Sequence, residues 1–126
     1  MMTVVHHAET RRIETPNAVM TTLASPTLGG AERPIWLVEM APGAVGPEHV
    51  FDVEQVWTLL SGAATFVLGG ESSLLSPGDT VVLPADVARQ VRADPTDGMS
   101  AIVTAPAGAR ASRVGETESQ VPPWIE

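Results

Sequence analysis

The fold is decided by two stretches of the sequence, GAVGPEHVFDVEQVWTLLSG at residues 43–62 and GDTVVLPADVAR at residues 78–89. Each begins at a glycine that follows a proline, and each contains an apolar run as long as a β-strand. Such runs, bounded by Gly, Pro, Ser and Asp, are typical of strands joined by tight turns. The same unit of apolar run and turn recurs outward in both directions, which predicts an all-β protein.

The apolar runs give the order of the expected strands. Two turns are also specified: Gly69-Gly70 supplies the positive φ of a tight hairpin, and Ser76-Pro77-Gly78-Asp79 has the signature of a type II turn. No segment has a long helical period. The predicted strands are Ala18–Leu23, Pro34–Met40, Gln55–Leu60, Ala63–Leu68, Ser72–Leu75, Thr80–Leu83, Ala88–Arg92 and Ser100–Ala105.

The length of 126 residues suits one domain. We expect an N-terminal arm or edge strand at residues 1–17, a barrel core at 18–107 and a C-terminal tail at 108–126. Residues 1–15 fit either a short helical turn or an edge strand. The tail is polar and ends in the sequence VPPWIE at residues 121–126, so we interpret it as an extended arm whose Trp124 docks on the barrel or on a partner subunit.

The charge balance narrows the choice of partners. Fifteen acidic residues face seven basic ones, a net charge of -8. Nucleic acid and anionic membrane surfaces both select basic faces, so neither is an expected partner. The chain has no cysteine, no apolar core of signal-peptide length at its start and no apolar run long enough to span a bilayer. We therefore expect a cytoplasmic protein.

The two stretches resemble the two motifs of the cupin superfamily. The first cupin motif runs G-x5-H-x-H-x3-4-E-x6-G, and this chain has Gly43, His49 and Gly62 in register. The second motif runs G-x5-P-x-G-x2-H-x3-N, and this chain has Gly78 and Pro84 in register. The resemblance implies a double-stranded β-helix, the jelly-roll barrel of cupins.

The metal-binding positions of the motifs are changed. The resemblance assigns two His and one Glu or Gln of the first motif, and one His of the second, as ligands. Here Phe51 replaces the second His, Gln55 stands at the Glu position, and Arg89 replaces the last His. Phe51 has no donor atom and Arg89 would repel a dication. We predict no cofactor; if a metal is held, His49 and Gln55 remain as its ligands.

The cupin register, with strand alternation, predicts which side chains line the barrel. Arg89 would hold a carboxylate or enolate in a bidentate way, and His49 would move a proton near neutral pH. Phe51 and Trp57 would stack on a flat ring. The predicted catalytic residues are His49 and Arg89, and the predicted substrate-binding residues are Phe51, Gln55, Trp57, Leu59 and Val91.

Structural interpretations of the same residues remain open. Arg89 would be a structural ion pair if Glu39, Glu54 or Asp86 supplied a counter-charge. His49 would be a remnant of a metal-binding ancestor, since no group that orients it is evident in the sequence.

Three functions follow. The first is a metal-independent enzyme, an isomerase, cyclase or lyase that acts on an anionic, partly aromatic small molecule. The second is a cupin that binds such a molecule without changing it, as a sensor or accessory protein. The third is a metal-dependent dioxygenase or isomerase with an atypical ligand set. We also expect a homodimer, because edge strands must be covered; residues 34–40 and 3–15 are the candidates for its surface.

Overall fold

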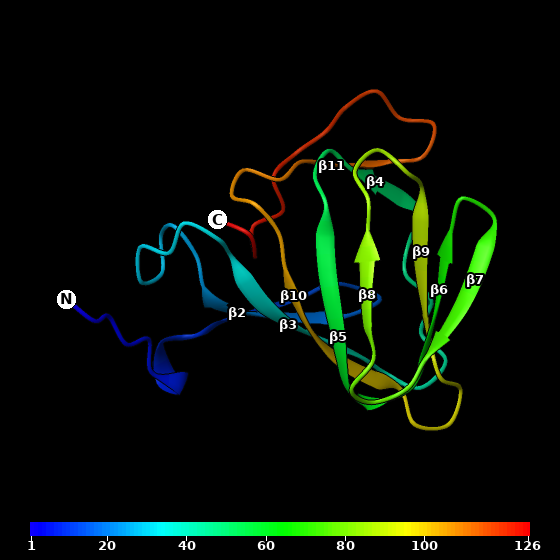
Figure 1. Ribbon diagram of the computed structural model, residues 1–126, viewed down its shortest axis with the longest axis horizontal. Coiled ribbons are helices and arrows are strands. Elements are labelled where there is room, and N and C mark those ends of the chain that lie inside the picture. Colours follow the sequence, from blue (N-terminus) through cyan, green and yellow to red (C-terminus); the bar gives the residue numbers. More distant parts are fainter.

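Two antiparallel sheets face each other in the computed structural model, which describes residues 1–126. One sheet has six strands in the order β1-β2-β3-β10-β5-β8, and the other has five in the order β11-β4-β9-β6-β7. Figure 1 shows the barrel that they enclose, with the N-terminal segment projecting from one side. The all-β jelly-roll prediction is confirmed.

The strands carry the bounds that place every later residue. A short 3-10 turn, η1, precedes them at His7–Glu9. The strands are β1 Arg11–Glu14, β2 Val19–Ala24, β3 Ile35–Met40, β4 His49–Phe51, β5 Gln55–Gly62, β6 Ala64–Leu68, β7 Glu71–Leu75, β8 Thr80–Leu83, β9 Arg89–Ala93, β10 Met99–Thr104 and β11 Ala111–Arg113.

All eight predicted strands occur, with ends shifted by at most two residues. Both predicted turns are confirmed as well. Gly69 and Gly70 have φ of 54° and 90° and join β6 to β7, and Gly78 has φ of 91°. In the second turn the Asp79 amide donates to the Ser76 carbonyl at 3.0 Å.

Strand alternation divides the side chains between a core and the surface. Along β5 the burial alternates from Gln55 to Leu59, with Gln55, Trp57 and Leu59 buried. Along β9, Arg89, Val91 and Ala93 are buried while Arg92 is exposed. The inward faces predicted for β5 and β9 are therefore correct, and they enclose an apolar core between the sheets.

The N-terminal segment contains both structures that the sequence left open, a 3-10 turn and the edge strand β1. β1 pairs with β2. β3, inside Pro34–Met40, is paired on both edges, by β2 and by β10. Of the two segments predicted for a dimer surface, only the N-terminal one therefore has a free strand edge, at β1.

The C-terminal tail does more than extend along the barrel. Its β11 joins the five-stranded sheet by pairing with β4. Trp124 is half-buried against the core, as expected, but the deepest anchor is Ile125, which is 1% exposed. The Thr22 hydroxyl donates to the Trp124 carbonyl at 2.7 Å and fixes the end of the tail to β2.

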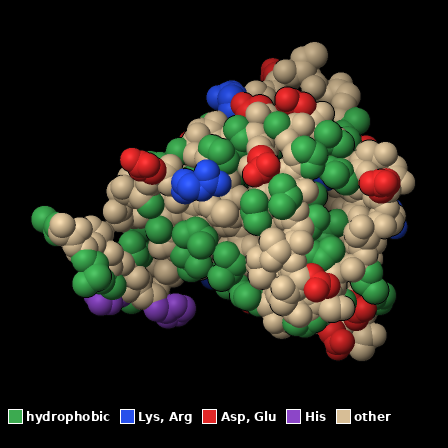
Figure 2. Space-filling model, in the orientation of Figure 1, with side chains coloured by type: hydrophobic (Ala, Val, Ile, Leu, Met, Phe, Trp, Pro, Cys, Tyr) green, Lys and Arg blue, Asp and Glu red, His purple; other side chains and the backbone are tan.

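The surface in Figure 2 has acidic side chains spread over the visible face. No helix is both long and apolar enough to cross a membrane.

Candidate functional site

Arg89 lies at the start of β9 with its side chain inside the barrel, only 2% exposed. Its Nε donates to the Val87 carbonyl at 3.1 Å, and its Nη2 donates to the Pro84 carbonyl at 2.6 Å. Nη1 is buried and has no hydrogen-bond partner. Both carbonyls belong to the loop between β8 and β9, so this loop fixes the plane of the guanidinium and leaves one nitrogen free.

The same loop is held in place by Asp86. Asp86 has φ of 65°, in the left-handed region where glycine is favoured. It stands at the position where the cupin motif has glycine, which explains why the motif has a glycine there. Its amide donates to the Phe51 carbonyl at 2.8 Å and ties the loop to β4.

No carboxylate forms an ion pair with Arg89. The only ion pair within 4 Å joins Arg12 to Glu14, so the proposed structural pairs with Glu39, Glu54 or Asp86 are absent. Burial lowers the pKa of Arg89, and the charge of Asp86 opposes that effect without contact. The guanidinium carbon lies 5.7 Å from the centre of the Phe51 ring, an attractive contact that does not neutralise the charge.

His49 is half-buried in β4, directly opposite Arg89 in β9. Its Nδ1 lies 2.8 Å from the Pro47 carbonyl. Because a carbonyl only accepts, Nδ1 carries the proton in the neutral ring, and Nε2 is left as the base. Its ring meets Phe51 edge-on, with centres 5.2 Å apart. The orienting group missing from the sequence interpretation is this backbone carbonyl.

The pKa of His49 is lowered. Burial is the largest cause, and the hydrogen bond to the Pro47 carbonyl opposes it. The positive charges of Arg89 and Arg113 lower the pKa further. The imidazole is therefore neutral near pH 7, which suits a group that accepts a proton.

The other predicted lining residues lie on β5 and further along β9. Gln55 is 1% exposed, and its Oε1 accepts from the Trp57 indole at 3.2 Å. Trp57 in turn meets Phe66 edge-on, with ring centres 5.2 Å apart. Leu59 and Val91 are part of the apolar core, 1% and 5% exposed.

The residues at the cupin ligand positions do not fit a divalent metal. His49 offers only its free Nε2, Oε1 of Gln55 is already engaged by Trp57, Phe51 offers no donor, and Arg89 brings a positive charge. No group of three or more His, Asp or Glu side chains is arranged to hold an ion.

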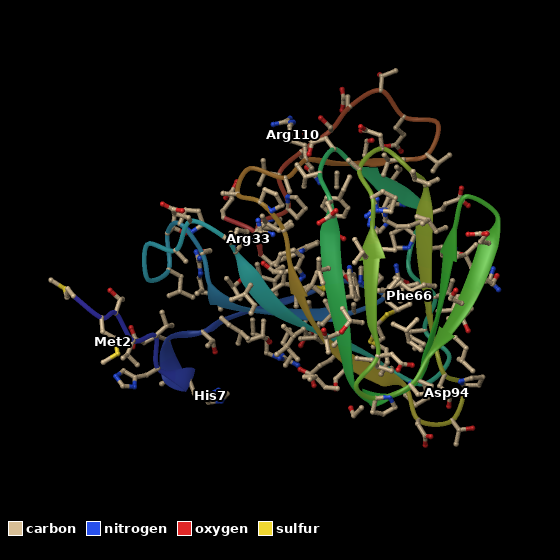
Figure 3. All side chains as sticks on the ribbon, viewed as in Figure 1. Met2, His7, Arg33, Phe66, Asp94 and Arg110 are labelled. Atoms are coloured by element: carbon tan, nitrogen blue, oxygen red, sulfur yellow. The ribbon has the colours of Figure 1, made fainter.

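Two surface hollows lie away from Arg89. One, of about 280 Å³, is lined in part by Gly43, Thr65 and Asp94. Figure 3 shows Asp94 at the opposite end of the barrel from Arg110. The other, of about 300 Å³, lies beside Ile125 of the tail. Neither hollow is lined by Arg89 or His49, so the candidate site is identified from a buried guanidinium that has no ion pair.

Two features of the site escaped the sequence interpretation. One is the Pro47 carbonyl. Its only signal in the sequence is that Pro47 lies two residues before the motif histidine, His49. The other is Arg113 in β11, which pairs with His49 on the side away from Arg89. Arg113 lies in the tail, where apolar periodicity gives no signal.

Residues 36–105, more than half of the chain, match the Cupin domain family. The chain therefore belongs to the cupin family, as the motifs predicted. No curated protein matches the chain.

Solved structures share the fold over most of the chain. The polyketide cyclase RemF from Streptomyces resistomycificus has a TM-score of 0.77 at 21% identity, over 94% of this chain and 89% of its own. KdgF from Halomonas sp. has a TM-score of 0.69 at 23% identity, over 84% and 94%. Salicylate 1,2-dioxygenase from Pseudoaminobacter salicylatoxidans, with gentisate adducts, has a TM-score of 0.71 at 19% identity, over 84% of this chain and 31% of its own. At these identities the likeness establishes the fold.

Proposed function

We propose that the protein binds an anionic, partly aromatic small molecule at Arg89 and converts it without a metal, as an isomerase, cyclase or lyase. The observation that carries this proposal is the uncompensated guanidinium. Arg89 is 2% exposed, has no carboxylate within 4 Å and keeps a buried nitrogen without a partner. A buried charge of this kind is unfavourable unless an anionic ligand pairs with it.

In this proposal, the bidentate contact predicted from the sequence would not use the side-on fork of Arg89. The side-on fork of Arg89 includes Nε, which already donates to Val87. A ligand oxygen would therefore meet Nη1. The developing negative charge of an enolate would be stabilised there, in a place that water does not reach.

His49 would be the proton acceptor. Its Nε2 lone pair is free, its ring is held by Pro47, and it lies beside Arg89 in the sheet. An acid next to a guanidinium and a neutral imidazole loses a proton more easily, because the product anion is stabilised where it forms. Phe51, between both groups, offers a ring face or edge to a flat substrate.

The named relatives support the class of substrate. A polyketide cyclase and a dioxygenase seen with gentisate both use this fold. Polyketides and gentisate are oxygen-rich, and gentisate is an aromatic acid. A flat, acidic substrate would suit an interior of Arg89, His49 and Phe51.

A binding protein without catalysis is the second candidate. This function is favoured because the site has a single acid-base group, His49. Acid–base enzymes commonly use a second group that returns a proton to the substrate after the first has removed one. Turnover separates the two functions. In an enzyme, His49→Gln lowers the rate about 100-fold with binding retained; an unchanged rate would remove His49 from the mechanism.

The proposal is tested by calorimetric titration with p-toluate, a flat ring with one carboxylate. Arg89→Met is expected to lower the affinity at least about 30-fold, because a buried charge contact is lost. The thermal midpoint should stay nearly unchanged, since the loss of two hydrogen bonds to carbonyls is offset by removal of a buried charge.

Arg92→Met is the matched control. Arg92 lies three residues further along β9, is exposed, and donates only to Gln90. It should bind p-toluate like the wild type. Equal affinity of wild type and Arg89→Met would overturn the proposal, and a large loss of stability in Arg89→Met would return Arg89 to a structural role.

A further inference from the structure

Three residues of different strands form one row across the five-stranded sheet. Arg113 of β11 is directly opposite His49 of β4, and His49 is directly opposite Arg89 of β9. Directly opposite residues of antiparallel strands project from the same face of a sheet. The row therefore places two guanidinium groups on either side of one imidazole, on the face that points into the barrel.

Exposure falls steadily along this row. Arg113 is exposed, His49 is half-buried, and Arg89 is 2% exposed. The row thus runs from solvent at the edge of the sheet to the interior. Since strands lie about 4.8 Å apart, the two arginine Cα atoms are about 10 Å apart.

Neither arginine is neutralised by the protein. The chain has a net charge of -8, yet no carboxylate lies within 4 Å of Arg113 or Arg89. The acidic residues nearest to Arg113 along the chain and across the sheet are Glu116 and Glu48, which meet this region through backbone contacts. Two cations on either side of one imidazole give this row a positive potential that attracts an anion.

We infer that Arg113 is a second anion-binding residue, and that the site takes a flat ligand with two acidic groups, one held by Arg89 and one by Arg113. This inference rests on the proposed function, because it assumes that Arg89 binds an anion. The ring of the ligand lies along His49 and Phe51. The row also sets the direction of entry, with one acidic group reaching Arg89 while the other stays at the rim.

The test compares terephthalate with p-toluate, which has the same ring and a methyl group in place of the second carboxylate. In calorimetric titrations at low salt, the wild type is expected to bind terephthalate about tenfold more tightly. Arg113→Gln should remove that preference, so that it binds terephthalate and p-toluate about equally. Arg113→Lys should restore part of it, because the charge remains while the planar fork is lost.

The control Arg92→Gln removes an exposed arginine from the opposite face of β9 and should keep the full preference. If the wild type showed no preference for terephthalate, or if Arg113→Gln kept the wild-type preference, this inference alone would be overturned, provided that Arg89→Met still bound p-toluate weakly. Binding of neither acid, or normal binding by Arg89→Met, would overturn the proposed function and the inference together.

Discussion

At one end of the barrel interior, around Gly62 and Gly98, the buried side chains are apolar: Met40, Ala64, Ala93 and Met99. At the other end, beside β4 and the loop from β8 to β9, the interior holds the buried side chains of Arg89 and Gln55 and the half-buried side chain of His49. The first end has no buried charged side chain and has its backbone groups paired, for example Ala63 N–H to the Gly98 carbonyl at 3.1 Å. The second keeps a charged nitrogen unpaired.

This difference indicates a division of labour between the ends. Packing at the Gly62 end supplies stability, and that stability allows an unfavourable charge to persist at the Arg89 end. Substitutions at the Gly62 end should therefore lower the free energy of unfolding without touching anion affinity. Substitution of Arg89 at the other end should lower the anion affinity with little change in the free energy of unfolding.

The largest effect is expected from Gly62→Ala. Gly62 has φ of 71°, and an added Cβ would overlap the backbone carbonyl oxygen of Gly98. Because backbone must move, we expect a loss of more than about 3 kcal/mol in denaturant unfolding, or no folded protein. Gly78→Ala is the control: its φ is also positive, at 91°, but the added Cβ meets nothing within 4 Å. It should lose only about 1 kcal/mol. Equal losses would mean that contact at Gly62 is unimportant.

Leu59→Ala should follow, with a loss of about 2–5 kcal/mol from the cavity left in the core. Leu59 is 1% exposed, and its backbone is paired with the turn at Gly78. Urea unfolding gives the stability, and titration with p-toluate gives the affinity. An unchanged affinity would assign Leu59 to the core; a fall in affinity would place it in the ligand site, as the sequence predicted.

The variant His49→Gln tests how His49, at the Arg89 end, makes the free energy of unfolding depend on pH. Because the pKa of His49 is lowered in the folded state, the unfolded chain binds its proton first as pH falls. The contribution of His49 to the free energy of unfolding is fully present above about pH 6.5. It is lost as the pH falls toward the folded-state pKa, with a slope of at most about 1.4 kcal/mol per pH unit.

The measurement is thermal or urea unfolding between pH 7.5 and 4.5 for wild type and His49→Gln. The carboxylates are common to both proteins, so their effect cancels in the difference. We expect the difference between wild type and His49→Gln to change over this range. A flat difference for His49→Gln would show that its pKa is not lowered.

The smallest effect concerns Asp86, whose φ of 65° is tolerated by Asp and Asn better than by Ala. Asp86→Asn should change the free energy of unfolding by less than about 0.5 kcal/mol, whereas Asp86→Ala should lose about 1 kcal/mol. Equal effects of the two substitutions in urea unfolding would mean that the left-handed conformation is not what limits this position.

The sequence was sufficient for most of the barrel. Runs such as Gln55–Leu60 and Thr80–Leu83 have apolar residues and turn glycines at their ends, and these local features specify the strands. β4 and β11 were not predicted as strands, because each has only three residues and depends on its partner. Pairing between residues 49–51 and 111–113 is a long-range event that leaves no local pattern.

The candidate site was predicted in part. The motif positions of His49, Phe51 and Arg89 indicated an interior cation beside an imidazole, and the structure brings these three together. The pairing state of Arg89 was left open, since it depends on the path of the loop from Pro84 to Val87. The place of Arg113 depends on β11 and was missed for the same reason as that strand.

The two backbone carbonyls that hold Arg89 have a consequence for the thermodynamics of binding. A free arginine side chain loses up to about 2 kcal/mol of conformational entropy when a ligand immobilises it. Arg89 has already lost that freedom during folding, because Pro84 and Val87 fix its guanidinium. Exposed Arg113 has not, so its contact with a ligand should be partly offset by ordering. The rigid arginine would then set where the ligand sits, and the mobile one would set how long a ligand the site accepts.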